Sequence, residues 1–182
     1  MSAIATKVTV EEYAKLTPLR DGRYELRHGE VVKVGFPNAT HVTIQWRLRP
    51  LLEQALGAAW MVHSEVPSRP LEEYELWGAD VAAIAQPRWD AAQQQGWLSG
   101  SPELVIEVLS PSNTAAEMLD REETCFAGGC KEFWVVDPDR RLIKTARADG
   151  WTHTYSEGDE IPLDSLNGGK LSVSAVFQPS ER

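Results

Sequence analysis

The chain has 182 residues, of which 42% are hydrophobic and 25% charged, a composition typical of a globular protein with one buried core. Its formal net charge of −9 disfavours a protein that holds nucleic acid through one broad basic surface, because such binding depends on neutralised phosphates. The sequence contains no run of about 18 apolar residues, the length that would predict a membrane helix. Its first residues lack the pattern of a secretory signal. We therefore expect a single cytoplasmic domain spanning residues 1–182, with no membrane partner.

The charge is unevenly distributed along the chain. Residues 1–60 contain eight Lys/Arg against six Asp/Glu, whereas residues 61–182 contain ten against twenty-one. A nucleic-acid-binding surface would therefore be N-terminal, although each basic residue there fits a solvated surface position equally well. The candidates are Arg20, Arg23, Arg27, Lys33, Arg47 and Arg49.

The two cysteines offer no metal or disulfide framework. Cys125 and Cys130 are not spaced as a CxxC pair, and no metal-spaced partner accompanies them. They are expected to be reduced, structural thiols.

The N-terminal third predicts a short helix, a hairpin and a longer helix. Thr9 to Glu12 form a capping-box pattern, and Thr17-Pro18 should end the helix that follows. Alternation on both sides of His28-Gly29 predicts a β-hairpin over residues 23–34. Apolar spacing predicts a helix over residues 40–56, which Pro50 would kink or restart.

The rest of the chain predicts strands that alternate with one further helix. Leu104 to Leu109 is an apolar run bounded by prolines, which predicts a central strand. Thr114 or Asn113 would cap a helix that Gly128-Gly129 ends. A strand, a helix and a strand in this order indicate an α/β fold with a mixed sheet. Further strands are expected at 60–66, 77–84, 133–136 and 142–146, a loop at 86–101 and irregular β structure at 160–177.

The most informative residue for chemistry is Glu107. A carboxylate flanked by Val105, Ile106, Val108 and Leu109 costs several kcal/mol to bury unless a cation pairs with it. It is either a metal ligand in a cleft, or a glutamate paired with an arginine or facing solvent.

Asp80 stands at the start of another apolar strand, so two strands could present carboxylates to one cleft. Such a pair favours Mg²⁺ or Mn²⁺, which take oxygen ligands. Taken alone, Asp80 fits an ordinary strand-start aspartate equally well.

Several motifs resemble one protein family, across most of the chain. The specific blocks are Pro102–Ser112, which contains EVLSPS, and Gly129–Pro138, which contains EFWVVDP. Shorter matches are Tyr24-Glu25-Leu26, His28-Gly29-Glu30, His41 and Ala79-Asp80-Val81. Together they resemble the Uma-two family, described as candidate restriction endonucleases. The resemblance implies the PD-(D/E)XK nuclease fold, in which helices flank a mixed sheet with an acidic site at its edge.

The resemblance also implies roles for single residues. Asp80 matches the aspartate of the first motif of that fold, and Glu107 the acidic residue of the second, so both would bind the metal. Glu25 matches an additional acidic residue from the N-terminal part. His41 matches a histidine at a helix start and would contact substrate, or else pack there. Glu103 matches an aspartate that follows proline, and capping or surface roles suit it equally.

One departure concerns the catalytic lysine. The standard pattern has lysine two places after the second acidic residue, where this chain has Leu109. The family supplies a lysine from the next helix instead, thirteen residues before the tryptophan that here is Trp134, and Arg121 occupies that position. Arginine cannot act as a base at neutral pH, but it can hold a phosphate. The alternative is an exposed i,i+4 ion pair with Glu117.

These residues predict a metal-dependent endonuclease that hydrolyses DNA phosphodiester bonds, with Mg²⁺ or Mn²⁺ as cofactor and DNA as partner. A nuclease-fold protein that is weakly active or inactive and acts as a binding or assembly module is the alternative, motivated by the missing lysine and the acidic charge. A two-carboxylate glycosidase has less support. A homodimer is expected, with the surplus of tryptophans either at an interface or capping the core. The tryptophans near predicted turns or loops are Trp77, Trp89, Trp97 and Trp151.

Overall fold

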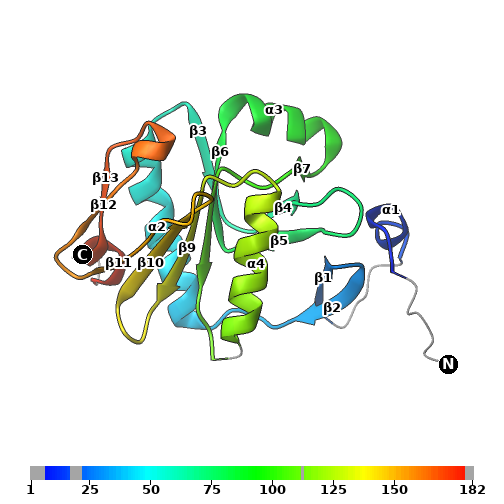
Figure 1. The fold of residues 1–182 in the computed structure, drawn as a ribbon, viewed down its shortest axis with the longest axis horizontal. Coiled ribbons are helices and arrows are strands. Elements are labelled where there is room, and N and C mark those ends of the chain that lie inside the picture. Colours follow the sequence, from blue (N-terminus) through cyan, green and yellow to red (C-terminus); the bar gives the residue numbers. More distant parts are fainter. Residues whose placement is uncertain (1–6, 17–21, 112, 179–182) are drawn as a thin grey trace.

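Groups of successive strands are separated by helices in the computed structural model, which describes residues 7–16, 22–111 and 113–178 (Figure 1). The elements are α1 (Val10–Tyr13), β1 (Arg23–Arg27), β2 (Glu30–Val34), α2 (Ala39–Leu56), β3 (Trp60–His63), β4 (Val66–Arg69), β5 (Trp77–Ala79), β6 (Val81–Ala85), α3 (Gln86–Gln95), β7 (Leu98–Ser99), β8 (Leu104–Val108), α4 (Ala115–Ala127), β9 (Glu132–Asp137), β10 (Leu142–Arg147), β11 (Thr152–Ser156), β12 (Glu160–Pro162), the 3-10 helix η1 (Asp164–Leu166), β13 (Lys170–Ser172) and α5 (Val173–Phe177).

The main sheet has the strand order β11-β10-β9-β8-β6-β3. Strands β8 and β9 are parallel and are joined through α4, while the other neighbours pair antiparallel. This mixed sheet confirms the predicted α/β fold, and β8 is an interior strand as its apolar sequence predicts.

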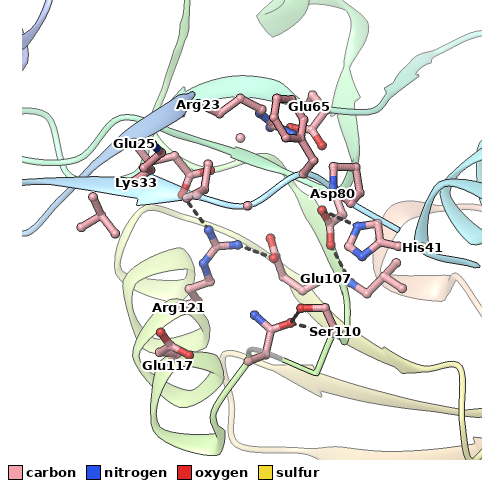
Figure 2. A pocket seen from close by; sticks show the side chains of 18 of the residues that line it. Arg23, Glu25, Lys33, His41, Glu65, Asp80, Glu107, Ser110, Glu117 and Arg121 are labelled. Carbon is pink, nitrogen blue, oxygen red and sulfur yellow. Dashed lines mark hydrogen bonds and ion pairs between the residues drawn. The ribbon is translucent and has the colours of Figure 1, made fainter. Parts of the chain in front are cut away.

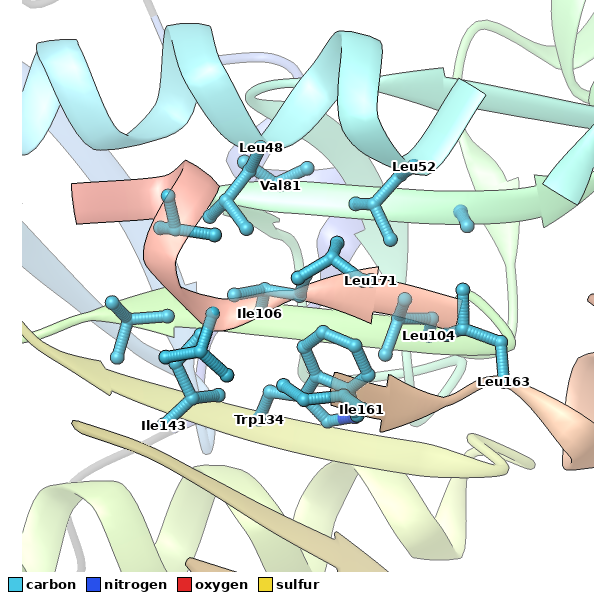
Figure 3. Packing of buried hydrophobic residues seen from close by; sticks show 14 of the residues in the cluster. Leu48, Leu52, Val81, Leu104, Ile106, Trp134, Ile143, Ile161, Leu163 and Leu171 are labelled. Atoms are coloured by element: carbon cyan, nitrogen blue, oxygen red, sulfur yellow. The ribbon is translucent and has the colours of Figure 1, made fainter. Parts of the chain in front are cut away.

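The two faces of the sheet are covered by different helices (Figure 1). Side chains alternate along β8, so Leu104 and Ile106 pack into the cluster formed with α2 and the C-terminal segments, while Val105 packs into the opposite cluster with Cys125 of α4. Trp134 is fully buried in the first cluster (Figure 3). Because Glu107 has the same parity as Val105, it lies on the α4 face.

The hairpin β1–β2 stands apart from the main sheet. His28 and Gly29 at its turn both have positive φ, as a two-residue type I′ turn requires. Leu26 is fully buried, and its backbone N–H and C=O both bond to Leu76 at 2.9 Å, beside the small sheet β5-β4-β7. The hairpin is therefore held against the body of the protein.

The caps of the two long helices agree well with their sequences. Asn38 accepts from the backbone N–H of His41 at 2.9 Å and begins α2, which continues through Pro50 without restarting. Thr114 forms a capping box with Glu117 at the start of α4. The left-handed residue after α4 is Gly129 (φ 93°).

The segment 86–101, predicted as a loop, instead forms α3 and β7. Pro87 occupies the first turn of α3, where its missing N–H costs nothing, and Gly96 ends the helix in the left-handed conformation. Glutamine and alanine in between are good helix formers. Ala92 is the only buried residue of α3, so this surface helix has the polar composition that is usual for a loop.

Other boundaries also differ from the prediction. The predicted strand 60–66 divides at Ser64-Glu65 into β3 and β4, and the strand 77–84 divides at Asp80 into β5 and β6. The irregular β structure predicted at 160–177 includes η1 and α5, and β11 was not predicted. The first capping box at Thr9 is confirmed, but α1 already ends at Tyr13; Thr17, Pro18, Arg20 and Ser112 lie outside the described residues.

No helix among the described residues has both the length and the apolar character needed to cross a membrane.

Candidate functional site

The register of two antiparallel strands brings Asp80 and Glu107 together. Val81 of β6 pairs with Ile106 of β8, so the next position along that register sets Asp80 opposite Glu107. Residues directly opposite in an antiparallel pair share a face, with Cβ atoms about 5 Å apart. Figure 2 shows the two carboxyl groups side by side, as the sequence predicted.

Three groups fix the orientation of Asp80. Its Oδ2 accepts from the backbone N–H of Val108 at 2.7 Å. Its Oδ1 lies 2.9 Å from Nε2 of His41 and accepts from the amide of Gln45 at 3.2 Å. The short contact with Asp80 assigns the histidine proton to Nε2. Two side chains from one turn of α2 therefore hold this carboxylate in place.

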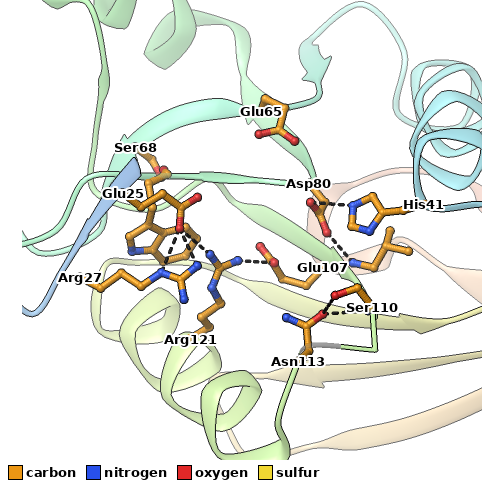
Figure 4. Close-up of polar contacts among 12 residues, drawn as sticks. Glu25, Arg27, His41, Glu65, Ser68, Asp80, Glu107, Ser110, Asn113 and Arg121 are labelled. Carbon is orange, nitrogen blue, oxygen red and sulfur yellow. Dashed lines mark hydrogen bonds and ion pairs between the residues drawn. The ribbon is translucent and has the colours of Figure 1, made fainter. Parts of the chain in front are cut away.

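Glu107 is 4% exposed, and its two oxygens have different surroundings. Oε2 accepts from the guanidinium of Arg121, whereas Oε1 is buried with no hydrogen-bond partner (Figure 4). Burial raises the pKa of Glu107 to about 8; Arg121 acts to lower it, and the charges of Asp80 and Glu25 add to the rise. A buried acceptor of this kind favours a cation as its partner.

Arg121 reaches the same point from α4. It donates to Oε2 of Glu25 at 2.9 Å as well as to Glu107, and it lies 4.7 Å from the centre of the Trp77 ring. Burial alone would lower the pKa of its guanidinium, but Glu107, Glu25 and Asp80 outweigh burial and raise it. At 9% exposed, Arg121 faces inward, and the alternative of an exposed pair with Glu117 is wrong.

The hairpin forms the opposite wall of a pocket of about 360 Å³. Alternation along β1 gives Arg23, Glu25 and Arg27 one common face, and all three line this pocket. Arg27 donates to Glu25 at 2.6 and 2.9 Å, and Arg23 pairs with Glu65. Figure 4 shows Glu25 between the guanidinium groups of Arg27 and Arg121.

The donor set fits a hard divalent cation that keeps open positions. No group of three or more His, Cys, Asp or Glu side chains in the described ranges is placed to enclose a metal. Mg²⁺ is commonly held by one or two carboxylates together with water and substrate phosphate. Asp80 and the unpaired Oε1 of Glu107 supply such a pair.

The structure brings together all five predicted site residues, namely Glu25, His41, Asp80, Glu107 and Arg121, which line one pocket. Glu103 lies elsewhere: it accepts from the backbone N–H of Ala85 at 3.3 Å and pairs with Arg88 at 3.0 Å. Glu103 therefore holds the start of α3 in place. It is 7% exposed, so it does not have a surface role.

Sequence reasoning missed two polar residues of the site. Gln45 stands four residues after His41 on the buried face of α2, so a polar residue among apolar ones was an available signal. Glu65 gives no comparable signal: it has positive φ (58°), accepts from Gln45 at 3.4 Å and pairs with Arg23.

A solved structure shares this fold. A crystal structure described as a "putative nuclease belonging to DUF820" from Anabaena variabilis superposes with a TM-score of 0.77 at 18% identity, covering 93% of this chain and 97% of that chain. This likeness shows a restriction-endonuclease-like fold.

A curated protein that matches part of the chain is an enzyme of a different kind. The mitochondrial NAD-dependent malic enzyme of Amaranthus hypochondriacus is 33% identical over 102 residues, which are 54% of this chain. The matched region is only 16% of that enzyme, so malic enzyme activity is not transferred to this chain.

A family model also matches most of the chain. Uma2, described as "Putative restriction endonuclease", matches residues 10–174. That range contains every residue of the site described above. The chain therefore belongs to the Uma2 family of restriction-endonuclease-like proteins.

Proposed function

We propose that this protein is a divalent-metal-dependent nuclease that hydrolyses phosphodiester bonds of DNA. The observation that carries the proposal is the buried Oε1 of Glu107, which has no hydrogen-bond partner and lies beside Asp80 at the inner end of the pocket. A cation that binds Oε1 during function would explain why this buried oxygen has no hydrogen-bond partner.

The side chains divide the work between them. Asp80 and Glu107 would hold Mg²⁺ or Mn²⁺, which supplies a Lewis acid for the phosphate and makes water more acidic. His41 and Gln45 hold Asp80 in one orientation. Arg121 stays cationic, so it would bind a phosphate oxygen and stabilise the charge that develops there. Glu25 shares the guanidinium of Arg121 and would keep it in place.

A bound cation would favour the entry of a phosphate into the pocket. The charged side chains that line it are Arg23, Arg27, Lys33, Arg121, Glu25, Glu65, Asp80, Glu107 and Glu117. Because the pKa of Glu107 is raised to about 8, this carboxyl group is largely protonated at neutral pH without metal, and the other four carboxylates balance the four cations. A divalent cation that displaces this proton changes the net charge of the pocket to +1, which attracts a phosphate.

We also propose that the protein works in the cytoplasm as a homodimer. Val42 and Trp46 lie one turn apart on α2 and are 47% and 66% exposed, so they form an apolar face that a second copy would cover. Gel filtration with light scattering tests this, and a mass near 20.3 kDa at micromolar concentration contradicts it.

Cleavage of labelled DNA, single-stranded and duplex, in Mn²⁺ tests the activity. Asp80→Asn and Glu107→Gln keep the shape of each side chain and should abolish cleavage. Asp120→Asn is the control, because Asp120 is an exposed carboxylate next to Arg121 that does not line the pocket. Cleavage that persists in both site variants contradicts the proposal.

A binding or assembly module is the second candidate. Both terminal nitrogens of the Arg121 guanidinium are paired with carboxyl groups, Nη2 with Glu25 and Nη1 with Glu107, instead of being open to a phosphate. Inactive wild-type protein that binds DNA without metal supports it.

A further inference from the structure

An exposed phenylalanine stands at the mouth of the pocket. Phe36 lies in the connection between β2 and α2, lines the pocket and is 82% exposed. It is the most exposed of the large hydrophobic side chains that the structure describes. An aromatic ring left in water beside a polar site is a candidate contact for a planar ligand.

Cationic side chains occupy the same wall. Arg23 and Arg27 lie on the pocket face of β1, and both guanidinium groups are paired with carboxylates, those of Glu65 and Glu25. Arginine binds phosphate in the same planar, bidentate manner in which it binds carboxylate. The phosphates of a nucleic acid that enters the pocket can therefore replace these carboxylates as partners of the arginines, and Phe36 lines the same pocket as both arginines.

We propose that the pocket takes a single-stranded or locally unpaired segment of nucleic acid, with one base stacked on Phe36 while the adjoining phosphate reaches Arg121, Asp80 and Glu107. This inference rests on the proposed function. Both faces of a base inside a duplex are covered by its neighbours, so a base must be unstacked before it can pack on an aromatic ring.

The burial of the acidic residues supports the same substrate class. Glu107 is 4% and Glu25 7% exposed, so a phosphate that reaches them would have to enter the pocket that the hairpin and α4 line. A single strand does this without loss of base pairing, whereas a duplex loses stacking energy at the site.

Fluorescence anisotropy in Mn²⁺ tests the inference, with a labelled phosphorothioate oligonucleotide of about 12 nucleotides, a length typical of single-strand sites. Phosphorothioate linkages resist hydrolysis, so binding is read without turnover. Phe36→Ala should weaken single-strand binding by about 5- to 150-fold, the range for loss of one stacked base. Phe36→Tyr keeps the ring and should bind like wild type. Trp151→Ala, which removes an exposed aromatic outside the pocket, should have no effect.

Oligonucleotides with one base removed at successive positions locate the contact. At one position, loss of the base should weaken binding to wild type but not to Phe36→Ala, because the partner of that base is already missing. Mn²⁺ binding by Phe36→Ala should equal that of wild type.

Three outcomes overturn the inference. Equal affinity of Phe36→Ala and wild type for the single strand means that the ring makes no contact. Tighter binding of a matching duplex than of the single strand contradicts the substrate class. Conversion of a dimer to a monomer by Phe36→Ala shows that a second copy covers the ring. Failure of the proposed function is distinguishable, because wild type would then bind no Mn²⁺, whatever its affinity for the oligonucleotide.

Discussion

At the scale of single residues, the central feature is a guanidinium that bridges two buried carboxyl groups. Arg121 contacts Glu107 and Glu25, and all three side chains are at most 10% exposed. Such a group is well suited to phosphate binding, because a phosphate can replace either carboxylate as its partner. The same arrangement makes the arginine a structural requirement of the metal-free protein.

Replacement of Arg121 by methionine should therefore destabilise the fold. The change leaves buried Glu107 without a cation, whereas Glu25 keeps Arg27 as its partner, and breaking a buried pair in this way costs about 3–5 kcal/mol. Urea denaturation measures the loss. The double variant Glu107→Gln with Arg121→Met removes the carboxylate that has lost its partner and should recover part of the loss. A single variant as stable as wild type contradicts this account of the ion pairs.

A second residue, His28, should make stability depend on pH. Its Nε2 lies 2.8 Å from Asp120 of α4 and its Nδ1 lies 3.0 Å from Glu75. The hydrogen bond to Asp120 is the largest influence and raises the pKa of His28, burial lowers it, Glu75 raises it and Lys7 lowers it. Because the folded pKa exceeds the unfolded value of about 6.5, protonated His28 favours the folded state.

The contribution of His28 is thus fully present below about pH 6.5 and is lost as the pH rises through the folded pKa. His28→Gln should lower the urea midpoint more at about pH 5.5 than at about pH 8.5. Asp120→Asn, which removes the largest cause, should reduce the difference. An equal effect of His28→Gln at both pH values would show that the contact is not ionic.

The sequence was sufficient to predict the residues that carry the proposed chemistry and insufficient for those that orient them. Glu107 could be recognised because a carboxylate in an apolar strand needs a partner. The direction of Arg121 could not, because an arginine on an amphipathic helix can face either way until the strands beside it are placed. Glu65 depends on a turn and on Arg23 of a distant hairpin.

At the scale of elements, α4 positions Arg121 through the way the helix begins and ends. Thr114 caps its start, and the chain turns sharply at Gly128-Gly129 into β9. A Cβ built on Gly128 would lie 2.4 Å from Oγ of Ser101 and 2.7 Å from the carbonyl oxygen of Pro70. The end of the helix is therefore packed against two other segments.

Gly128→Ala should accordingly cost about 1–3 kcal/mol through overpacking. Thermal or urea unfolding measures this loss. Gly57→Ala serves as the comparison, because its Cβ would meet nothing within 4 Å and its cost comes from positive φ alone. If Gly128→Ala is tolerated without loss, the close packing between α4 and Pro70 is not maintained in solution.

The elements were predictable where the sequence carried a strong local signal. The hairpin follows from alternation and α2 from helical spacing, whereas β8 follows from a continuous apolar run between prolines and α4 from its capping residues. The helix in segment 86–101 was not predicted, because α3 lies on the surface and its mostly polar residues show no apolar periodicity. Strands 60–66 and 77–84 look continuous in sequence, but the chain bends at Ser64-Glu65, where Glu65 has positive φ, and again at Asp80.

At the scale of the whole molecule, metal and nucleic acid should bind cooperatively. The net charge of the protein is −9, and the pocket itself is lined by one more carboxyl group than cationic groups. Affinity for a phosphorothioate oligonucleotide should be about 5- to 150-fold higher in Mn²⁺ than in EDTA, the usual range of coupling between sites. By linkage the oligonucleotide must raise Mn²⁺ affinity by the same factor. Equal affinity with and without metal contradicts the coupling.

The most direct test of the central claim is a calorimetric titration of Mn²⁺ into the wild-type protein, with Asp80→Asn, Glu107→Gln and the control Asp120→Asn. All four proteins should first be shown to be folded. We expect wild type and Asp120→Asn to bind Mn²⁺ alike, and each site variant to lose binding. Unchanged Mn²⁺ binding in both site variants, or no binding to wild type, would contradict a metal centre at Asp80 and Glu107.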